Sequence, residues 1–337
     1  MSDYTPLSEL GEFGLIKRLN EKIELRQPST IKGIGDDAAI INAGDKYFLF
    51  TTDMLIENIH FDLSYAPLTQ LGYKAISVNV SDIAAMNGIP KQVTVSIGLS
   101  NRFSVEAVEK LYEGIRYACE DFNIDLIGGD TTASPSGLVI SVSVVGEVEK
   151  SKVALRQNAE KGDIVCVTGD IGGAYIGLQV LQREKQEFLA NPNMQPQLDL
   201  YPYIVQRQLK PIARTDIIHE LRDLNVVPKA MIDISDGLAS ELNHLAKKSN
   251  VGFKIFEDKL PIDKQTYDTS VEFKVGPITC AMNGGEDYEL LFTISQDDFK
   301  KLEKHMDIHF IGYATDKSEG LKLITKEGNE VEIKAQG

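Results

Sequence analysis

Aspartate recurs along the chain in short signatures that also contain glycine, serine or threonine. Five of them are GIGDDAA with Asp36 and Asp37, TTD with Asp53, VNVSDIAAM with Asp82, IGGD with Asp130, and IDISDG with Asp233 and Asp236. A sixth signature, NGGEDYEL, carries Glu286 and Asp287. Carboxylate and hydroxyl oxygens are hard ligands of the kind that Mg²⁺ takes, and this ion keeps water and phosphate oxygens as its other ligands. The set therefore predicts a site for Mg²⁺ and a nucleotide phosphate.

Each aspartate taken alone also has a structural explanation. Asp, Ser and Gly are favoured in turns and at helix N-caps, and Asp236 in SDGLASEL could cap the helix that follows it. The prediction of a metal site therefore depends on the number of these residues and on their neighbours. Asp36 and Asp37 are adjacent, and two carboxylates in a partly buried site repel each other unless a cation neutralises them. Glu286 follows two glycines, which allow the backbone to approach a ligand closely.

The composition predicts a globular, cytoplasmic protein. The 337 residues suggest two domains, and no apolar run is long enough to span a membrane. The start of the chain has no basic region followed by an apolar run, so we expect no secretory signal. The net charge of −15 disfavours binding to nucleic acid and suits an enzyme that bridges phosphates with metal ions. The cysteines lack metal-ligand spacing and predict buried thiols, namely Cys119, Cys166 and Cys280.

The elements that must position the carboxylates follow from the apolar pattern. Residues 47–53 predict a strand with Asp53 at its tip. The segment LTQLGYKAISVNVSDIAAMNG has apolar residues at helical spacing, which places Asp82 on a largely buried helix. The segment MIDISDG predicts a buried strand that ends in a turn beside Asp233. The carboxylates are therefore expected mostly at strand ends.

The other segments predict two blocks of strands and helices with a boundary near residue 150. In the first block we expect a helix at 104–121 and strands at 91–99, 124–130 and 137–148, with 124–130 running into a glycine turn. In the second block we expect strand, turn and helix within 163–181, a surface excursion at 184–200, helices at 212–224, 237–249 and 296–306, and strands at 288–294 and 308–313. The fold class is α/β or α+β, with domains at residues 1–150 and 151–337.

Common nucleotide-binding and hydrolytic motifs are absent from the sequence. It contains no GxxxxGK[ST] loop, no HRD or DFG kinase signature, and no zinc or Ser-His-Asp pattern. The segment GDIGGAYIG is only loosely similar to a dinucleotide fingerprint and is better explained as a tight strand-to-helix turn. The candidates for phosphate contact are then Arg156, Lys74 and the amides of glycine turns. His60 stands alone between apolar residues, where a histidine is more often packed than functional.

Eight signatures occur in the order seen in thiamine-monophosphate kinases: GEFGLI, GIGDDAA, TTD, NIHF, YKAISVNVSDIAAMNG, IGGDTT, IDISDGL and GGEDYEL. The chain therefore resembles this family from about residue 11 to residue 326. The family belongs to the PurM-like superfamily, with aminoimidazole ribonucleotide synthetase, selenophosphate synthetase and a hydrogenase-maturation protein. The resemblance implies ATP-dependent phosphorylation of thiamine monophosphate to thiamine diphosphate with several Mg²⁺ ions. It also implies a two-domain fold with a C-terminal α/β sandwich, in a homodimer whose N-terminal mixed sheets pair to close a barrel.

The resemblance also implies residue roles. Metal ligands would be Asp37, Thr51, Thr52, Asp53, Asp82, Asp130, Asp233 and Asp236. ATP would contact Gly129, Asp130, Arg156 and Ser235. The thiamine phosphate pocket would include His60 and Glu286, and the roles of Asp36, Asp287 and Tyr288 stay open. Family members commonly end in a short tail with an aromatic residue that covers the substrate; this chain ends in EIKAQG, which leaves the covering residue open.

No residue is assigned as a general base. The acceptor would be a phosphate monoester with a second pKa of ~6, which is already ionised near neutral pH. The enzyme must instead bring this dianion against a polyphosphate. Metal ions held by the carboxylates would offset the repulsion and align the two groups in line. We therefore expect direct transfer without a phosphoenzyme.

Two other functions stay open from the sequence. One is an ATP-dependent synthetase of the same superfamily that forms a phosphorylated intermediate. The region before GIGDDAA lacks the cysteine expected for selenophosphate synthesis, and EIKAQG lacks a hydrogenase-maturation cysteine. The other is a non-catalytic module that binds Mg–ATP, which the complete set of motifs in both halves disfavours.

Overall fold

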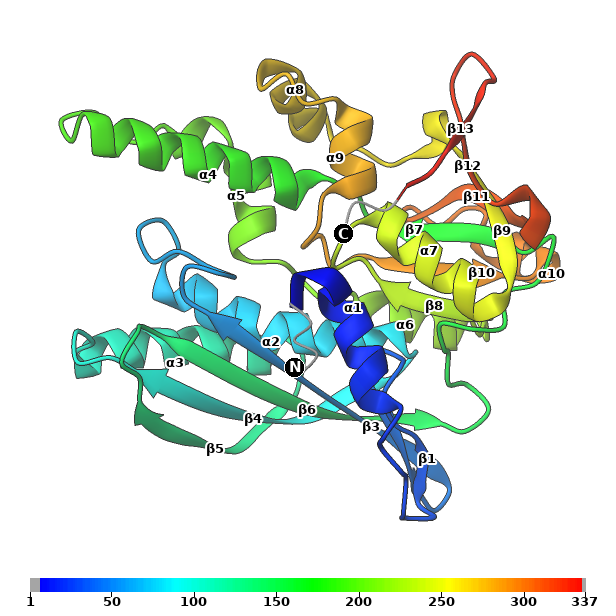
Figure 1. Cartoon of the computed structure of the whole chain (residues 1–337), viewed down its shortest axis with the longest axis horizontal. Coiled ribbons are helices and arrows are strands. Elements are labelled where there is room, and N and C mark those ends of the chain that lie inside the picture. The colour runs from blue at the N-terminus through cyan, green and yellow to red at the C-terminus, as the bar shows by residue number, and fades with distance from the viewer. Residues whose placement is uncertain (1–6, 335–337) are drawn as a thin grey trace, which may run out of the picture.

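Two mixed β-sheets with helices packed against them make up residues 7–334, the part of the chain that the computed structural model describes (Figure 1). The first sheet has the order β1 (Thr30–Lys32), β2 (Ala39–Ala43), β3 (Lys46–Ile56), β6 (Val139–Glu149), β4 (Ile89–Leu99), β5 (Asp125–Ala133). The second has the order β13 (Glu330–Glu332), β12 (Leu321–Ile324), β9 (Val251–Phe256), β11 (Ile308–Asp316), β7 (Ile164–Thr168), β10 (Leu290–Ile294), β8 (Ala230–Asp233). Among the described strands, β4–β5 and β9–β12 are parallel pairs and the other neighbours are antiparallel. The expected mixed α/β class is confirmed.

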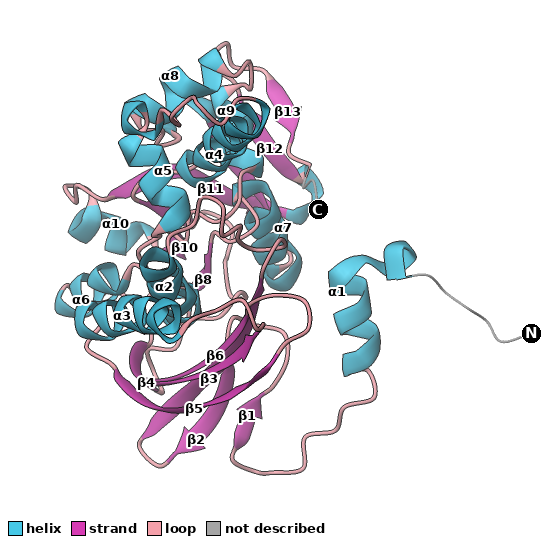
Figure 2. Cartoon of the chain, turned by 90° about the vertical axis from the view of Figure 1, so that its left-hand side faces the viewer, coloured by secondary structure: helices cyan, strands magenta, loops and turns pink. Residues whose placement is uncertain are grey.

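Helices accompany both sheets, and Figure 2 shows the first of them standing apart from the rest of the described chain. They are α1 (Leu7–Asn20), α2 (Leu68–Ala85), α3 (Val105–Asp121), α4 (Gly173–Ala190), α5 (Pro202–Leu209), α6 (Thr215–Asp223), α7 (Leu238–Ser249), α8 (Lys264–Glu272), α9 (Pro277–Asn283) and α10 (Gln296–Leu302). Figure 2 shows α2 and α3 together on one face of the first sheet. The second sheet has α7 in the core on one face and α6 and α10 in the core on the other. Within residues 7–334, no helix has the length and apolar character needed to cross a membrane.

The helix α2 lies between the two sheets. It packs against β3 and β6 of the first sheet and against β8 of the second. Every residue from Leu71 to Ala85 except Asp82 is buried. Because buried polar groups need partners, the side chains of Lys74, Ser77 and Ser81 on α2 bond to the second half of the chain. Oγ of Ser77 accepts the amide of Ala213 at 2.9 Å, for example. These bonds and the apolar packing fix Asp82 at the junction of the two sheets.

The first sheet has one covered face and one open face. Ile140 and Val142 of β6 are fully buried in the core that includes α2 and α3. On the opposite face, Phe48, Phe50 and Met54 of β3 are 44%, 43% and 52% exposed. A row of large apolar side chains on an open sheet face is typical of an interaction surface.

Most predicted elements are confirmed within a few residues, including the buried helix with Asp82, the MIDISDG strand and the turn before α4. Two predicted ends were wrong. The strand with Asp53 continues to Ile56, because β3 pairs with β6 along its whole length. The helix α4 continues to Ala190, so the surface excursion begins only after it. The sequence analysis missed α1, α5, α8, α9, β1, β2, β9, β12 and β13, and residues 335–337 of the EIKAQG end lie outside the described residues.

The predicted glycine turn at IGGD was also wrong. Gly128, Gly129 and Asp130 continue β5 as an extended edge strand paired with β4. A Cβ atom on Gly129 would lie 1.8 Å from the carbonyl oxygen of Val95. The glycine is therefore required by the close approach of two strands.

The backbones of α3 and the start of α2 also approach each other closely, at Gly114 of α3. A Cβ atom there would lie 1.8 Å from the carbonyl oxygen of Thr69. We expect Gly114→Ala to lower the free energy of unfolding by about 2–3 kcal/mol, although alanine itself favours a helix by about 1 kcal/mol. Chemical denaturation measures the change. Glu109→Ala, on the exposed side of the same helix, should change it by less than about 0.5 kcal/mol; equal effects of the two variants would contradict the close packing.

Candidate active site

Three carboxylates from distant parts of the sequence meet at the junction of the two sheets. Asp37 lies in the loop between β1 and β2, Asp82 on α2, and Asp233 at the end of β8. Their nearest oxygens all lie within 4.8 Å of one another. All three are predicted metal ligands, and the tertiary structure brings them into one cluster.

Two of these carboxylates are oriented by hydroxyl groups. Oγ1 of Thr51 donates to Oδ2 of Asp82 at 2.6 Å. Oγ of Ser81 donates to Oδ2 of Asp233 at 2.6 Å. Since Ser81 and Asp82 are neighbours on α2, this helix contributes one carboxylate and fixes another.

The third carboxylate is held by Arg156. Its guanidinium donates to both oxygens of Asp37, from Nη2 at 2.7 Å and from Nε at 3.3 Å. The backbone amide of Arg156 donates to Asp36 at 2.8 Å, and Asp36 also pairs with Lys32. Asp36, whose role was left open, therefore anchors the segment that carries Arg156.

Burial raises the pKa values of all three carboxylates in this cluster. It raises the pKa of Asp233 to about 7, and the nearby Asp37 adds to the effect. Burial also raises the pKa of Asp82 well above its ordinary value, with Asp233 and Asp53 contributing. The pKa of Asp37 is raised by burial although Arg156 opposes the change. The negative charge of the ionised carboxylates is not balanced by nearby positive side chains. Such a group of hard oxygen donors fits a divalent cation such as Mg²⁺.

The cluster lines a cavity of about 410 Å³ that also contains other predicted site residues, namely Thr51, Asp53, Arg156, Ser235 and Asp236. The amide of Asp53 donates to Oδ1 of Asn79 at 3.0 Å, which fixes this part of β3 to α2. Thr52 also lines this cavity, but its hydroxyl donates to the carbonyl oxygen of Val142 at 3.0 Å and accepts from Ser143 at 3.0 Å. Its side chain therefore lies on the open face of the sheet, away from the carboxylates.

The sequence analysis missed two residues of this cavity, Glu241 and His244 on α7. Burial, followed by the charge of Asp233, raises the pKa of Glu241 to about 8. Burial, followed by the charge of Arg156, lowers the pKa of His244 to about 4. The spacing held a signal for Glu241, since it lies three residues after Leu238 on the apolar stripe of α7.

A larger cavity of about 850 Å³ adjoins the first. The two cavities share a wall formed by His60, Lys74, Ser235, Asp236 and Glu286. Beyond this wall the larger cavity has an aromatic lining of Phe61, Tyr65, Tyr175 and Phe273.

The shared wall joins both halves of the chain. Nζ of Lys74 on α2 lies 3.1 Å from Oε1 of Glu286 and also donates to the carbonyl oxygen of Gln208 at 3.1 Å. The amide of Ile56 donates to Nδ1 of His60 at 3.0 Å, so the ring carries its proton on Nε2. The predicted phosphate contacts Lys74 and Arg156 thus both reach the smaller cavity.

Gly129 and Asp130 line neither cavity in the described part of the chain. Across the first sheet Asp130 is in register with Ser96, Ser141 and Met54. Because successive residues of a strand point to opposite faces, Asp130 shares the open face with Met54 and not the covered face with Asp53. The structure does not bring Asp130 to the carboxylate cluster of its own chain.

Sequence comparison matches residues 35–148 to the N-terminal domain, and residues 160–323 to the C-terminal domain, of AIR synthase related proteins. The thiamine-monophosphate kinase of Aquifex aeolicus (strain VF5) is 39% identical over 290 residues, which are 85% of this chain and 87% of that protein. The thiamine-monophosphate kinase of Bacillus subtilis (strain 168) is 34% identical over 336 residues, 97% of this chain and 98% of that protein.

Solved structures give the same picture. AaThiL complexed with AMPPCP and TMP has a TM-score of 0.83 and 36% identity, with 98% of each chain covered. The thiamine monophosphate kinase from Aquifex aeolicus has a TM-score of 0.79 and 34% identity, with 97% of this chain and 100% of that chain covered. The hydrogenase maturation protein HypE in complex with ATP has a TM-score of 0.69 at 16% identity over 96% of this chain and 95% of that chain, which shows a shared fold.

The carboxylate cluster predicts that metal binding is linked to proton release. Burial raises the pKa of Asp233 to about 7 and also raises the pKa of Asp82, so Asp233 is partly protonated near neutral pH and a cation must displace this proton. We expect Mg²⁺ affinity to fall as the pH is lowered from about 8 to about 6. Calorimetry in two buffers of different ionisation enthalpy measures the protons released.

Asp82→Asn should weaken Mg²⁺ binding, whereas Asp45→Asn, at an exposed position in the β2–β3 turn, should leave it unchanged. A Mg²⁺ affinity that does not vary with pH would contradict the assignment of the cluster.

Proposed function

The chain belongs to the thiamine-monophosphate kinase family, and we propose that it transfers the γ-phosphoryl group of ATP to thiamine monophosphate, giving ADP and thiamine diphosphate. The observation that carries this proposal is the pair of adjoining cavities. One is lined by carboxylates and suits metal and phosphates; the other is larger and partly aromatic. Their shared wall would bring the acceptor phosphate next to the γ-phosphoryl group. This reaction is the final step of thiamine diphosphate biosynthesis.

The roles that we assign follow the cavity linings. Several Mg²⁺ ions would be held by the cluster of Asp37, Asp82 and Asp233 together with Thr51, Asp53 and Asp236. A ligand from Thr52 would have to be its backbone carbonyl, since its hydroxyl is on the other face. ATP phosphates would contact Arg156 and Ser235, and thiamine monophosphate would contact His60 and Glu286.

The chain's own groups orient the reactants and offset charge. The acceptor phosphate, with a second pKa of ~6, is already an ionised nucleophile, so no side chain has to remove a proton. Mg²⁺ bound to the carboxylates would neutralise the developing charge on the transferred group. Arg156 and Lys74 bring positive charge to the smaller cavity, each fixed by a carboxylate. Transfer would then proceed directly, without a phosphoenzyme.

The larger cavity suits the cationic thiazolium and the pyrimidine of the acceptor. Aromatic faces attract cations and stack on flat rings, and the cavity offers Phe61, Tyr65 and Phe273. The carboxylates of Asp62 and Glu286 in the same lining are paired with Lys185 and Lys74. The aromatic faces therefore provide the support for binding of an aromatic cation.

The open face of the first sheet supports a homodimer. Large apolar side chains of β3 stay exposed on this face, and a second copy placed face to face would bury them. Asp130 lies on the same face. We therefore propose that Gly129 and Asp130 contact the metal and nucleotide held by the partner subunit.

Two further assignments complete the proposal. We place residues 1–150 in an N-terminal domain for Mg–ATP binding and dimerisation, and residues 151–337 in a domain that completes the site. We place the enzyme in the cytoplasm, which is supported by cysteines that are all free, namely Cys119, Cys166 and Cys280.

The reaction can be tested directly. Purified protein with Mg–ATP should convert thiamine monophosphate to thiamine diphosphate, identified by mass spectrometry, and free thiamine should not react. Asp82→Asn should lower kcat at least about a hundredfold, because a Mg²⁺ ion held by the cluster would lose a ligand, with an unchanged circular dichroism spectrum. Asp45→Asn is the matched control. Near-normal turnover of Asp82→Asn at ordinary Mg²⁺ would refute the metal role, and no turnover by the unaltered chain would refute the function.

The partner role of Asp130 predicts complementation between two inactive variants. Asp82→Asn and Asp130→Asn chains, co-expressed with different tags, should yield a heterodimer with about half of the wild-type activity, because one of its two sites has both carboxylates. Each homodimer should be inactive. If Asp130 served its own chain, the heterodimer would also be inactive, and if the two tags did not copurify, the homodimer itself would be wrong.

A further inference from the structure

The segment that presents Glu286 has a strained backbone. Glu286 and Tyr288 have φ angles of +66° and +52°, in the left-handed region that residues other than glycine rarely adopt. Their amides donate to the carbonyl oxygens of Ser235 at 2.7 Å and Ile234 at 2.9 Å. Strain of this kind persists only where the surroundings impose it, and Asp287 lies between the two residues.

Asp287 fixes the middle of this segment to a helix N-terminus. Its carboxylate is fully buried and accepts the amides of Gly172 at 2.6 Å and Ala174 at 3.1 Å, at the start of α4. The helix dipole favours an anion at this place. Gly172 has a φ of +87°, and a Cβ atom on it would lie 2.8 Å from the amide nitrogen of Ala281. The amides of this glycine turn therefore bind an internal carboxylate, although a glycine turn is also a candidate phosphate site.

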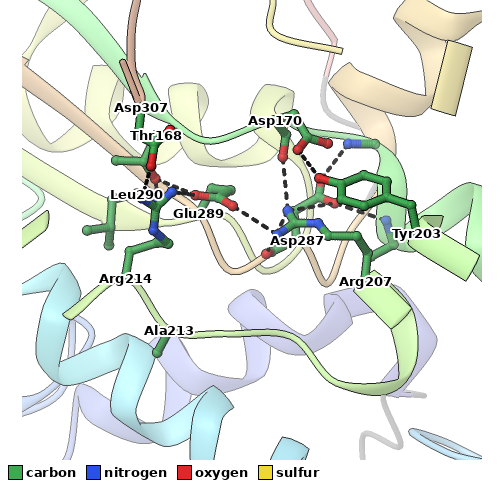
Figure 3. A network of polar contacts seen from close by, with 12 residues as sticks. Thr168, Asp170, Tyr203, Arg207, Ala213, Arg214, Asp287, Glu289, Leu290 and Asp307 are labelled. Atoms are coloured by element: carbon green, nitrogen blue, oxygen red, sulfur yellow. Dashed lines mark hydrogen bonds and ion pairs between the residues drawn. The ribbon is translucent and has the colours of Figure 1, made fainter. Parts of the chain in front are cut away.

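Two arginines fix Glu289, two residues after Asp287. Glu289, 2% exposed, pairs through Oε1 with Arg207 at 2.9 Å and through Oε2 with Arg214 at 2.8 Å. Arg207 also donates to the carbonyl oxygens of Asp170 at 2.9 Å and Asp287 at 3.3 Å. Figure 3 shows Glu289 between the two arginines, with Arg207 reaching on to Asp287.

The same arginine connects this network to the cavity wall. Arg207 is in the last turn of α5, and the next residue, Gln208, donates through Nε2 to Oε2 of Glu286. Lys74 binds the other oxygen of Glu286 at 3.1 Å and the carbonyl oxygen of Gln208 at 3.1 Å. Two neighbouring residues at the end of α5 therefore hold this segment. Arg207 binds the backbone carbonyl of Asp287, and Gln208 binds the side chain of Glu286.

We propose that Asp287 and the Arg207–Glu289 pair are positioning residues for the acceptor: they hold Glu286 in its left-handed conformation at the wall of the larger cavity and so set the affinity for thiamine monophosphate. This inference rests on the proposed function. A purely stabilising role explains the network less well, because a buried ion pair often stabilises a fold no more than apolar residues of the same size.

The test separates acceptor binding from ATP binding. In Asp287→Asn the amide group can accept one helix N–H but turns an N–H toward the other, so Glu286 should lose its fixed position. We expect KM for thiamine monophosphate to rise about tenfold or more while KM for Mg–ATP changes less than about twofold. In a Glu286→Ala background the same substitution should raise KM for thiamine monophosphate no further, because the residue through which it acts is gone. Glu289→Gln keeps the side-chain shape and should also raise KM for thiamine monophosphate without raising KM for Mg–ATP. This variant replaces Asp287→Asn in the test if Asp287→Asn fails to fold.

The matched control is Asp163→Asn. Asp163 is 4% exposed and pairs with Lys229 at 3.0 Å in the same half of the chain, away from both cavities. It should lower thermal stability and leave both KM values unchanged. Equal increases in both KM values in Asp287→Asn, unchanged values in a folded Asp287→Asn, or additive effects with Glu286→Ala would overturn the positioning role while the unaltered chain still phosphorylates thiamine monophosphate. An unaltered chain without that activity would instead refute the proposed function.

Discussion

Repulsion among buried carboxylates is the constraint on which the site depends. Asp37, Asp82 and Asp233 have oxygens within 4.8 Å of one another, and burial raises the pKa of each. Such a cluster persists only if the surrounding fold holds it rigidly. Here α2 is buried between two sheets, so that one short stretch contributes Asp82 and, through Ser81, orients Asp233. Arg156 alone cannot balance the cluster, which is why it fits a metal ion.

A second buried set of carboxylates is bound by arginines and helix amides of the chain itself. Glu289 pairs with both Arg207 and Arg214, and Asp287 binds the positive end of α4. Donors of the chain itself bind both carboxylates, although burial still raises the pKa of Asp287 to about 7. The two networks would then have different uses: in our proposals the first cluster binds cations and phosphates, and the second network holds a strained backbone segment. They meet at Glu286, at the wall between the two cavities.

The helical and strand patterns predicted much of the fold because burial follows periodicity. The helix with Asp82 and the strand of MIDISDG were found in this way. The prediction failed where pairing or close approach overrides local chemistry. Gly128 and Gly129 are ordinary turn residues in isolation, yet both continue β5, and at Gly129 the backbone of Val95 leaves no room for a side chain. Glu241 was missed because a glutamate on an amphipathic helix is normally exposed, although its spacing from Leu238 places it on the buried stripe.

The sequence by itself determined which residue types are available for chemistry and their order. The acidic signatures, the glycines beside them and the isolated Arg156 predict a metal and phosphate site, and the signatures indicate the family. Distances along the chain contain no information on which signatures meet. Only the tertiary structure decided that Asp37, Asp82 and Asp233 form one cluster, that the hydroxyl of Thr52 is on the other face, and that Asp130 is separated from Asp53 by its own sheet. These outcomes depend on strand register and on the burial of α2 between two sheets, which are properties of long-range packing.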